Sequence, residues 1–271
     1  MITPTSMPNV EPFIRQSGAG PAVVCIHANA GTSGQWRSLM DLLAPTHRVL
    51  APDCYGSGRS PDWHSDRVMS LKDEVAFLDP VFSRAGSSFS LVGHSYGAAV
   101  ALIAALTHPE RVRSLALYEP TLFALIDAGS APPNEADGIR DTVADAGAAL
   151  DRGDVAAAAE RFIDYWMGVG SWRATPEDRR PTIAASVKNI RRWAHALFTE
   201  PTPLARFATL RIPVLIMTGG ASTVSAHGVA RRLVPALPMA RQHDFPNLGH
   251  MGPVTHAEQV NAVVARFLAE V

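Results

Sequence analysis

Short apolar runs recur along the chain, separated by longer segments in which apolar residues repeat every three or four positions. A strand that is buried on both faces, as in a parallel sheet, gives a continuous apolar run. We therefore predict neighbouring strands of one sheet at residues 22–26, 48–51, 89–92, 112–118 and 212–218. Two more polar segments, 11–16 and 239–245, are predicted to be the first and last strands.

Helical patterns follow most of these strands. Helices are predicted over residues 33–43, 68–85, 98–106, 225–237 and 256–270. The last of them places five apolar side chains on one face, which is typical of a helix packed on a sheet: Val260, Val263, Val264, Phe267 and Leu268. Alternating strands and helices predict an α/β fold with a mostly parallel β-sheet flanked by helices.

The alternation is interrupted after the strand at 112–118. From Thr121 to Phe207 no segment has the pattern of a core strand, and a Pro-rich loop at 130–135 precedes helical patterns at 136–167 and 176–198. We expect a helical insertion there. The chain then divides into a first core part, 1–120, an insertion, 121–207, and a second core part, 208–271.

The sequence Gly93-His94-Ser95-Tyr96-Gly97 stands between an apolar strand and an Ala-rich helix. A sharp strand-to-helix turn needs small residues on either side of its centre, because a Cβ there would strike the neighbouring backbone. This requirement explains the glycines. Such a turn exposes Ser95 at the carboxyl end of the sheet. It also places the Tyr96 N–H at the start of a helix, where the dipole favours an oxyanion. A Gly-Ser turn without chemistry is the alternative, and the flanking strand and helix disfavour it.

With this G-x-S-x-G turn, the sequence resembles the α/β-hydrolase fold family over nearly the whole chain. The resemblance implies that Ser95 is a nucleophile and that the insertion is a helical cap over the active site. It also implies the chain order serine, acid, histidine. His250 follows Gly249 in the loop after the last strand and occupies the position of the family's general base. The other nine histidines lack that placement, and His94 is expected to point away from Ser95.

The turn after the strand at 22–26 reads His27-Ala28-Asn29. The family has His-Gly-x here, and the backbone N–H of x is the second oxyanion donor. The resemblance therefore assigns this role to the N–H of Asn29, alongside the N–H of Tyr96. Ala28 departs from the usual glycine, and His27 is expected to brace the turn by hydrogen bonding.

The acid of the proposed triad departs from the commonest family pattern. The loop after the strand at 212–218 contains no carboxylate, and Ser222 stands at the usual acid position. Glu119 ends the strand at 112–118, at the carboxyl edge where active-site groups of a parallel sheet gather. We therefore predict that Glu119 is the acid. Asp127 and Asp244 are the alternative candidates.

Composition narrows the possible partners. With 47% hydrophobic residues, 18% charged residues and a net charge of -1, the 271-residue chain has no bias towards nucleic acid or an anionic membrane. Met1–Val10 lacks the pattern of a secretion signal, so a cytoplasmic protein is expected. Cys25 and Cys54 are predicted to be buried free thiols rather than a disulfide. No metal or cofactor motif is present, and the sequence does not fix the oligomeric state.

These residues predict a serine hydrolase that cleaves a small, largely apolar carboxylic ester through an acyl-enzyme. A carbon–carbon bond hydrolase of aromatic degradation would use the same triad, with Arg173, Arg191 or Arg192 holding a dienoate carboxylate. A peroxidase-like or lyase activity without cofactor also fits the triad. The carboxylate missing at Ser222 would instead fit a homologue that only binds a small ligand. Most of the insertion's large side chains are expected to pack the insertion onto itself, and a few of them to line an apolar pocket: Phe162, Tyr165, Trp166, Met167, Trp172, Trp193 and Phe198.

Overall fold

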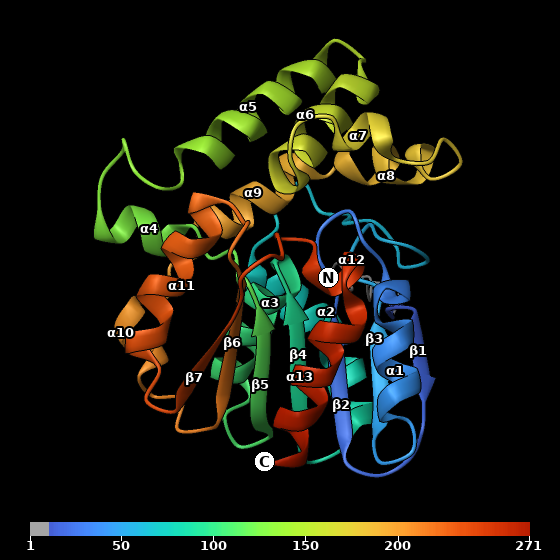
Figure 1. Ribbon diagram of the computed structural model, residues 1–271, viewed down its shortest axis with the longest axis vertical. Coiled ribbons are helices and arrows are strands. Elements are labelled where there is room, and N and C mark those ends of the chain that lie inside the picture. The colour runs from blue at the N-terminus through green and yellow to red at the C-terminus, as the bar shows by residue number, and fades with distance from the viewer. Residues whose placement is uncertain (1–10) are drawn as a thin grey trace, which may run out of the picture.

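A computed structural model describes residues 11–271 of the chain (Figure 1). The expectation about a leader in Met1–Val10 lies outside the described residues. One seven-stranded sheet has the order β1-β3-β2-β4-β5-β6-β7, in which β1 is antiparallel to β3 and the other neighbours are parallel. The strands are β1 (Ile14–Ser17), β2 (Ala22–Ile26), β3 (Arg48–Pro52), β4 (Phe89–His94), β5 (Val112–Tyr118), β6 (Val214–Gly219) and β7 (Ala240–Phe245).

The predicted α/β architecture is confirmed, and the burial of the strands explains it. Every residue of β2 and β6 is buried, as a continuous apolar run predicts for a central parallel strand. The strand β7 lies at the edge of the sheet and is exposed at three of its six positions, which is consistent with its polar sequence.

Helices cover both faces of the sheet and bury alternate residues of its strands (Figure 1). On one face, α1 (Arg37–Leu43) and α13 (Ala257–Ala269) share an apolar cluster with Val23 and Val92. The other face packs against α2 (Leu71–Ala85), α3 (Tyr96–Thr107) and α11 (Val224–Ala236). This two-sided cover is what makes the central strands apolar on both faces.

Several element boundaries differ from the predictions. The first strand begins at Ile14 rather than Glu11. The helix predicted from 33 divides into a 3₁₀ turn, η1 (Ser33–Trp36), and α1. The helix predicted from 68 begins at Leu71, because Ser70 and Asp73 form a reciprocal capping box that fixes its start. A short helix, α12 (Gly252–Thr255), precedes α13.

Seven helices lie between β5 and β6 (Figure 1). They are α4 (Ala124–Gly129), α5 (Asp137–Asp151), α6 (Val155–Met167), α7 (Ser171–Ala174), α8 (Arg180–Val187), α9 (Ile190–Phe198) and α10 (Leu204–Phe207). Most of this helical segment, residues 121–207, lies above the edge of the sheet at which β4, β5 and β6 end (Figure 1). Within residues 11–271, no helix has the length and apolar character needed to cross a membrane.

Candidate active site

Ser95 lies on a strained turn between β4 and α3. Its φ of 56° and ψ of -116° are unusual for a residue with a side chain. A Cβ at Gly93 would lie 2.6 Å from the Cα of Ala98, and one at Gly97 would lie 2.2 Å from the carbonyl oxygen of Ile26. Neither neighbour is a flexible side chain, so the turn forms only with glycine on both sides of Ser95. This is the geometry that the sequence predicted for the turn.

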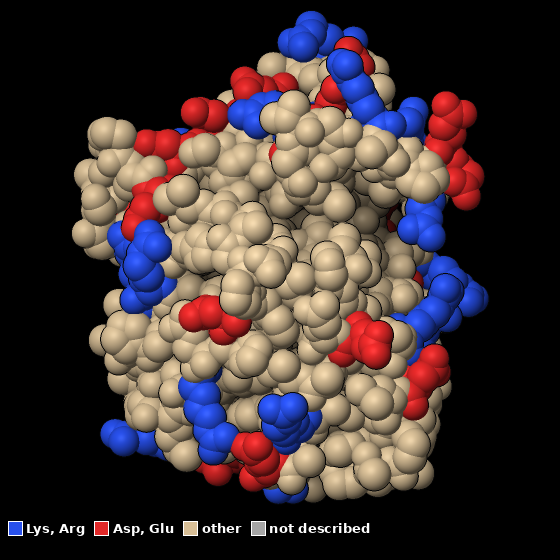
Figure 2. All heavy atoms as spheres, in the orientation of Figure 1, with Lys and Arg blue, Asp and Glu red and all other residues tan. Residues whose placement is uncertain are grey.

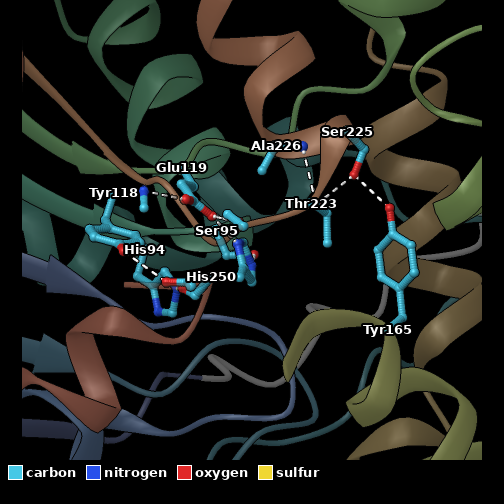
Figure 3. A network of polar contacts seen from close by, with 12 residues as sticks. His94, Ser95, Tyr118, Glu119, Tyr165, Thr223, Ser225, Ala226 and His250 are labelled. Carbon is cyan, nitrogen blue, oxygen red and sulfur yellow. Dashed lines mark hydrogen bonds and ion pairs between the residues drawn. The ribbon is translucent and has the colours of Figure 1, made fainter. Parts of the chain in front are cut away.

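His250 links Ser95 to a buried carboxylate (Figure 3). Its Nε2 lies 2.9 Å from the hydroxyl oxygen of Ser95, and its Nδ1 lies 2.6 Å from Oε2 of Glu119. Ser95, His250 and Glu119 are 5%, 2% and 0% exposed, so these hydrogen bonds are shielded from solvent. Glu119 and Ser95, which are 131 and 155 positions away from His250 in the sequence, thus both contact its ring.

Glu119 follows β5 directly and reaches the loop after β6. Its φ is 45°, a left-handed value that a residue with a Cβ adopts at a cost. Its Oε1 accepts a hydrogen bond from the N–H of Gly219 at 2.7 Å, and its Oε2 accepts one from the hydroxyl of Ser222 at 2.6 Å. The Glu119 carboxylate therefore lies beside Ser222, in a loop that has no carboxylate of its own.

The two alternative acids lie elsewhere. Asp127 forms an ion pair with Arg140 at 2.8 Å. Asp244 lies on β7, where hydrogen bonds from Thr218 and Gln242 lower the pKa of its carboxyl group. Both carboxylates are committed to partners other than His250.

His94 braces the backbone of His250, a contact that the sequence did not predict. It points away from the Ser95 hydroxyl as expected, and its Nε2–H donates to the carbonyl oxygen of His250 at 2.8 Å (Figure 3). Its Nδ1 accepts a hydrogen bond from the side-chain amide of Gln35 at 3.1 Å. The oxygen of that amide accepts the N–H of Ala28 at 3.2 Å. Burial lowers the pKa of His94, so the ring is neutral and keeps one donor and one acceptor.

Two backbone N–H groups near Ser95 are free. Those of Asn29 and Tyr96 donate to no acceptor within residues 11–271. Ala30, with a φ of 56°, turns the chain after Asn29. His27 braces this turn as expected, because its Nε2 accepts the N–H of Cys54 at 3.0 Å and its Nδ1–H donates to the carbonyl of Ala28 at 2.7 Å.

A second buried carboxylate lies behind the serine turn. Oε2 of Glu74 accepts a hydrogen bond from the hydroxyl of Tyr96 at 2.9 Å, and its Oε1 accepts the N–H of Tyr55 at 2.9 Å. Burial raises the pKa of Glu74 to about 6. Sequence reasoning missed this residue, because its position in an amphipathic helix does not reveal that it faces the core.

Ser95 and His250 open into a cavity of about 490 Å³ between the sheet and the helical segment. Charged side chains are sparse over the middle of the face in Figure 2 and gather at its edges. The cavity wall is largely apolar, and Arg179 is its one charged member among the described residues. Side chains from the helical segment that form the wall include Ile139, Val143, Phe162, Trp166, Met167, Ile183, Trp193 and Leu197.

The structure sorts the predicted pocket residues into two groups. Phe162, Trp166, Met167 and Trp193 line the cavity as expected. The other three aromatic candidates lie outside its wall: Trp172 belongs to the hydrophobic cluster that joins the sheet to the helical segment, and Tyr165 and Phe198 pack against that cluster.

The three arginines considered for a dienoate carboxylate also lie outside the wall. Arg173 pairs with Glu160 at 3.0 Å and Arg191 pairs with Asp151 at 2.6 Å. Arg192 donates instead to the carbonyl of Tyr55 at 3.3 Å.

Both cysteines are buried free thiols, as predicted. Burial raises the pKa of the Cys25 thiol and of the Cys54 thiol, which makes them poor nucleophiles. In the described residues, no group of three or more His, Cys, Asp or Glu side chains is arranged to hold a metal ion.

A doubly covered, mostly parallel sheet with a serine on a tight turn after a central strand defines the class of α/β hydrolases. The chain belongs to this family, because a family model described as "alpha/beta hydrolase fold" matches residues 21–257. It is similar to 2-hydroxymuconate semialdehyde hydrolase of Pseudomonas sp. (strain CF600), with 27% identity over 95% of this chain and 90% of the relative.

Two further comparisons agree with this assignment. Pimeloyl-(acyl-carrier protein) methyl ester esterase of Nitrosomonas europaea is 27% identical over 91% of this chain and 95% of the relative. The crystal structure of an alpha/beta hydrolase from Sphaerobacter thermophilus DSM 20745 matches with a TM-score of 0.70 and 26% identity, covering 95% of this chain and 96% of that chain. The protein is therefore an enzyme of the hydrolase class.

Proposed function

We propose that this protein is a serine hydrolase of small, largely apolar carboxylic esters. One observation carries the proposal: the hydrogen-bonded series Glu119–His250–Ser95 ends at the wall of an apolar cavity. A serine hydroxyl is a weak nucleophile at neutral pH, and it needs a base within hydrogen-bond reach and a group that orients the base. The distances at His250 meet both requirements.

In the first half of the reaction, the Ser95 oxygen attacks the ester carbonyl carbon while Nε2 of His250 takes the hydroxyl proton. The carbonyl electron pair moves to oxygen, and the free N–H groups of Asn29 and Tyr96 are the donors proposed to stabilise that oxyanion. Glu119 accepts the Nδ1–H and stabilises the imidazolium. The tetrahedral intermediate then collapses, and His250 gives its proton to the leaving alcohol.

In the second half, water replaces the alcohol. His250 removes a proton from the water as its oxygen attacks the acyl carbon of the Ser95 ester. Collapse of this intermediate breaks the bond to Ser95, which recovers its proton from His250, and releases the carboxylic acid. The same residues thus serve acylation and deacylation, and every step is a proton or acyl transfer.

The substrate class follows from the cavity wall. Its apolar side chains favour an uncharged acyl or aryl group, because small-molecule sites bind mainly through apolar contact. We propose that the helical segment 121–207 acts as the cap that supplies most of this wall. Water exclusion by this cap would strengthen the hydrogen bonds at His250.

A carbon–carbon bond hydrolase is the second candidate, favoured by the similarity to 2-hydroxymuconate semialdehyde hydrolase. Such a substrate carries a carboxylate that needs a cation. Arg173 and Arg191 are held in ion pairs outside the cavity wall. Among the described residues, Arg179 is the one arginine or lysine on the wall, and its side chain is exposed. The ester is therefore the better-supported substrate.

A homologue that only binds ligand was suggested by the missing carboxylate at Ser222. The contact between Glu119 and His250 argues against this alternative, because Glu119, at the end of β5, provides the carboxylate that the loop at Ser222 lacks.

The test is labelling with a fluorophosphonate probe, read by intact mass. Wild type should gain one adduct and Ser95→Ala none, while Ser114→Ala, which removes a buried serine hydroxyl on β5, should label like wild type. Turnover of p-nitrophenyl esters should exceed turnover of a dienoate substrate at least tenfold. Labelling of Ser95→Ala would refute the assignment of the nucleophile, and preferred turnover of the dienoate would favour the second candidate.

A further inference from the structure

An indole ring from the helical segment lies flat against the imidazole of His250. The ring centroids of Trp166 and His250 are 3.9 Å apart and their planes differ by 24°. Trp166 is 8% exposed and forms part of the cavity wall. It belongs to α6, whereas every other side chain in contact with the ring of His250 described above comes from the core.

The neighbouring residue fixes α6 to the core. The Tyr165 hydroxyl lies 2.7 Å from the hydroxyl of Ser225, at the start of α11 (Figure 3). Thr223, the N-cap of α11, lies 3.0 Å from the same Ser225 hydroxyl. Consecutive residues of α6 therefore contact two different parts of the core, one of which is His250. This anchors Trp166 in place.

The charged and titratable groups around His250 are few. Glu119 faces Nδ1, and Ser95 faces Nε2. The ring of His94 lies 5.2 Å away and is neutral, and the Tyr118 hydroxyl donates to the carbonyl of Gly249. Within residues 11–271, Glu119 is thus the one charged side chain in contact with the imidazole. The edges of the imidazole are held by hydrogen bonds, and Trp166 covers a face.

A stacked indole has two effects on an imidazole that gains and loses a proton. The face of an aromatic ring is its negative part, so it attracts the imidazolium that forms when Ser95 loses its proton. Stacking also opposes rotation of the imidazole out of line with Glu119 and Ser95. Both effects are larger in a site from which water is excluded.

We propose that Trp166 is a positioning residue for His250, holding the imidazole between Glu119 and Ser95 and stabilising its protonated form. Proton transfer at Ser95 then requires α6 to be seated on the core. This inference rests on the proposed role of His250 as general base. Under this proposal, a residue of the helical segment positions a residue of the core.

The kinetic test compares Trp166→Leu and Trp166→Phe with Trp172→Leu. Trp172 is a matched control, because it is 7% exposed in the same helical segment but lies outside the cavity wall. With p-nitrophenyl acetate, Trp166→Leu should lower kcat about thirtyfold with little change in KM. Trp166→Phe keeps an aromatic face and should recover most of kcat, and Trp172→Leu should stay within twofold of wild type.

A spectroscopic test is independent of turnover. A protonated imidazole quenches the fluorescence of an indole stacked on it. The tryptophan fluorescence of wild type should therefore fall with decreasing pH, with the same midpoint as the acid limb of kcat/KM. This titration should vanish in Trp166→Leu and in His250→Gln and persist in Trp172→Leu.

The outcomes separate this inference from the proposed function. A fluorescence titration that persists in Trp166→Leu, or an unchanged kcat in that variant, would overturn the role of Trp166. Esterase activity that survives Ser95→Ala would instead overturn the proposed function, and the fluorescence titration would still report whether the two rings are stacked.

Discussion

The hydroxyl of Ser222 donates a 2.6 Å hydrogen bond to Oε2 of Glu119, the same oxygen that faces Nδ1 of His250. The two residues are 103 positions apart and follow adjacent strands, β5 and β6. A serine thus stands where the family commonly carries the acid, and it holds the acid that arrives from the neighbouring strand. Hydrogen bonds to a carboxylate favour its ionised form, which is the form that orients an imidazole.

Ser222→Ala should lower kcat about tenfold, because Glu119 loses one of its charge-assisted hydrogen bonds. Ser222→Thr keeps the hydroxyl and should recover most of the activity. Steady-state kinetics on a p-nitrophenyl ester measure both effects. Thr223→Ala is the control, because it removes the next hydroxyl along the chain, which bonds Ala226 and Ser225 rather than Glu119. Equal losses in the alanine variants would show that only the loop's structure matters.

Glu119→Gln should lower kcat about a thousandfold, because an amide cannot stabilise the imidazolium and disfavours the required tautomer of His250. Asp244→Asn, on β7 and without contact to His250, should keep activity within about twofold of wild type. Circular dichroism and kinetics on both purified variants provide the measurement. Near-normal turnover of Glu119→Gln together with a large loss in Asp244→Asn would reverse the assignment of the acid.

Gly97→Ala should destabilise the protein by at least about 2 kcal/mol and abolish activity, because the new Cβ would lie 2.2 Å from the carbonyl oxygen of Ile26. Gly147, inside helix α5, is the matched position. The new Cβ of Gly147→Ala would meet only the flexible end of the Arg191 side chain, at 2.7 Å. That side chain is able to move, and alanine is the better helix former, so no loss is expected. Urea unfolding of the two variants tests this contrast, which would fail if both lost stability equally.

Glu74 should make the protein less stable as the pH rises. Its pKa is about 6 in the folded state, above its ordinary value of 4.5, because burial removes water from the carboxyl group and disfavours its ionised form. Between these two values the unfolded chain loses its proton first and binds fewer protons than the folded chain. The contribution of Glu74 to the free energy of unfolding therefore falls by about 2 kcal/mol from pH 4 to pH 7, and this loss remains above pH 7.

Glu74→Gln removes this titration and keeps an oxygen for the N–H of Tyr55. The difference in unfolding free energy between wild type and Glu74→Gln should therefore shift by about 2 kcal/mol in favour of the variant between pH 4 and pH 7. Urea titrations at several pH values measure it. A difference that is constant across this range would show that the carboxyl group is not desolvated in the folded state.

Much of the fold could be predicted from the sequence, because the signals are local. A strand buried on both faces must be apolar at successive positions, so the runs at 22–26 and 212–218 identified central strands before any contact was known. The turn at Ser95 is equally local, since its glycines and flanking elements are adjacent in sequence. Helix starts were less well predicted, because capping at Leu71 depends on individual side-chain hydrogen bonds.

By itself, the sequence determined the α/β architecture, the serine turn and the absence of a carboxylate between Gly219 and Val224. Only the tertiary structure decided which side chains touch His250. Glu119 could be proposed from the end of its strand, but its contact with Ser222, the brace from His94 and the stack of Trp166 join segments far apart in the chain. Such contacts depend on how helices and strands pack in three dimensions, and sequence periodicity records which face of an element is buried but not which residue it meets.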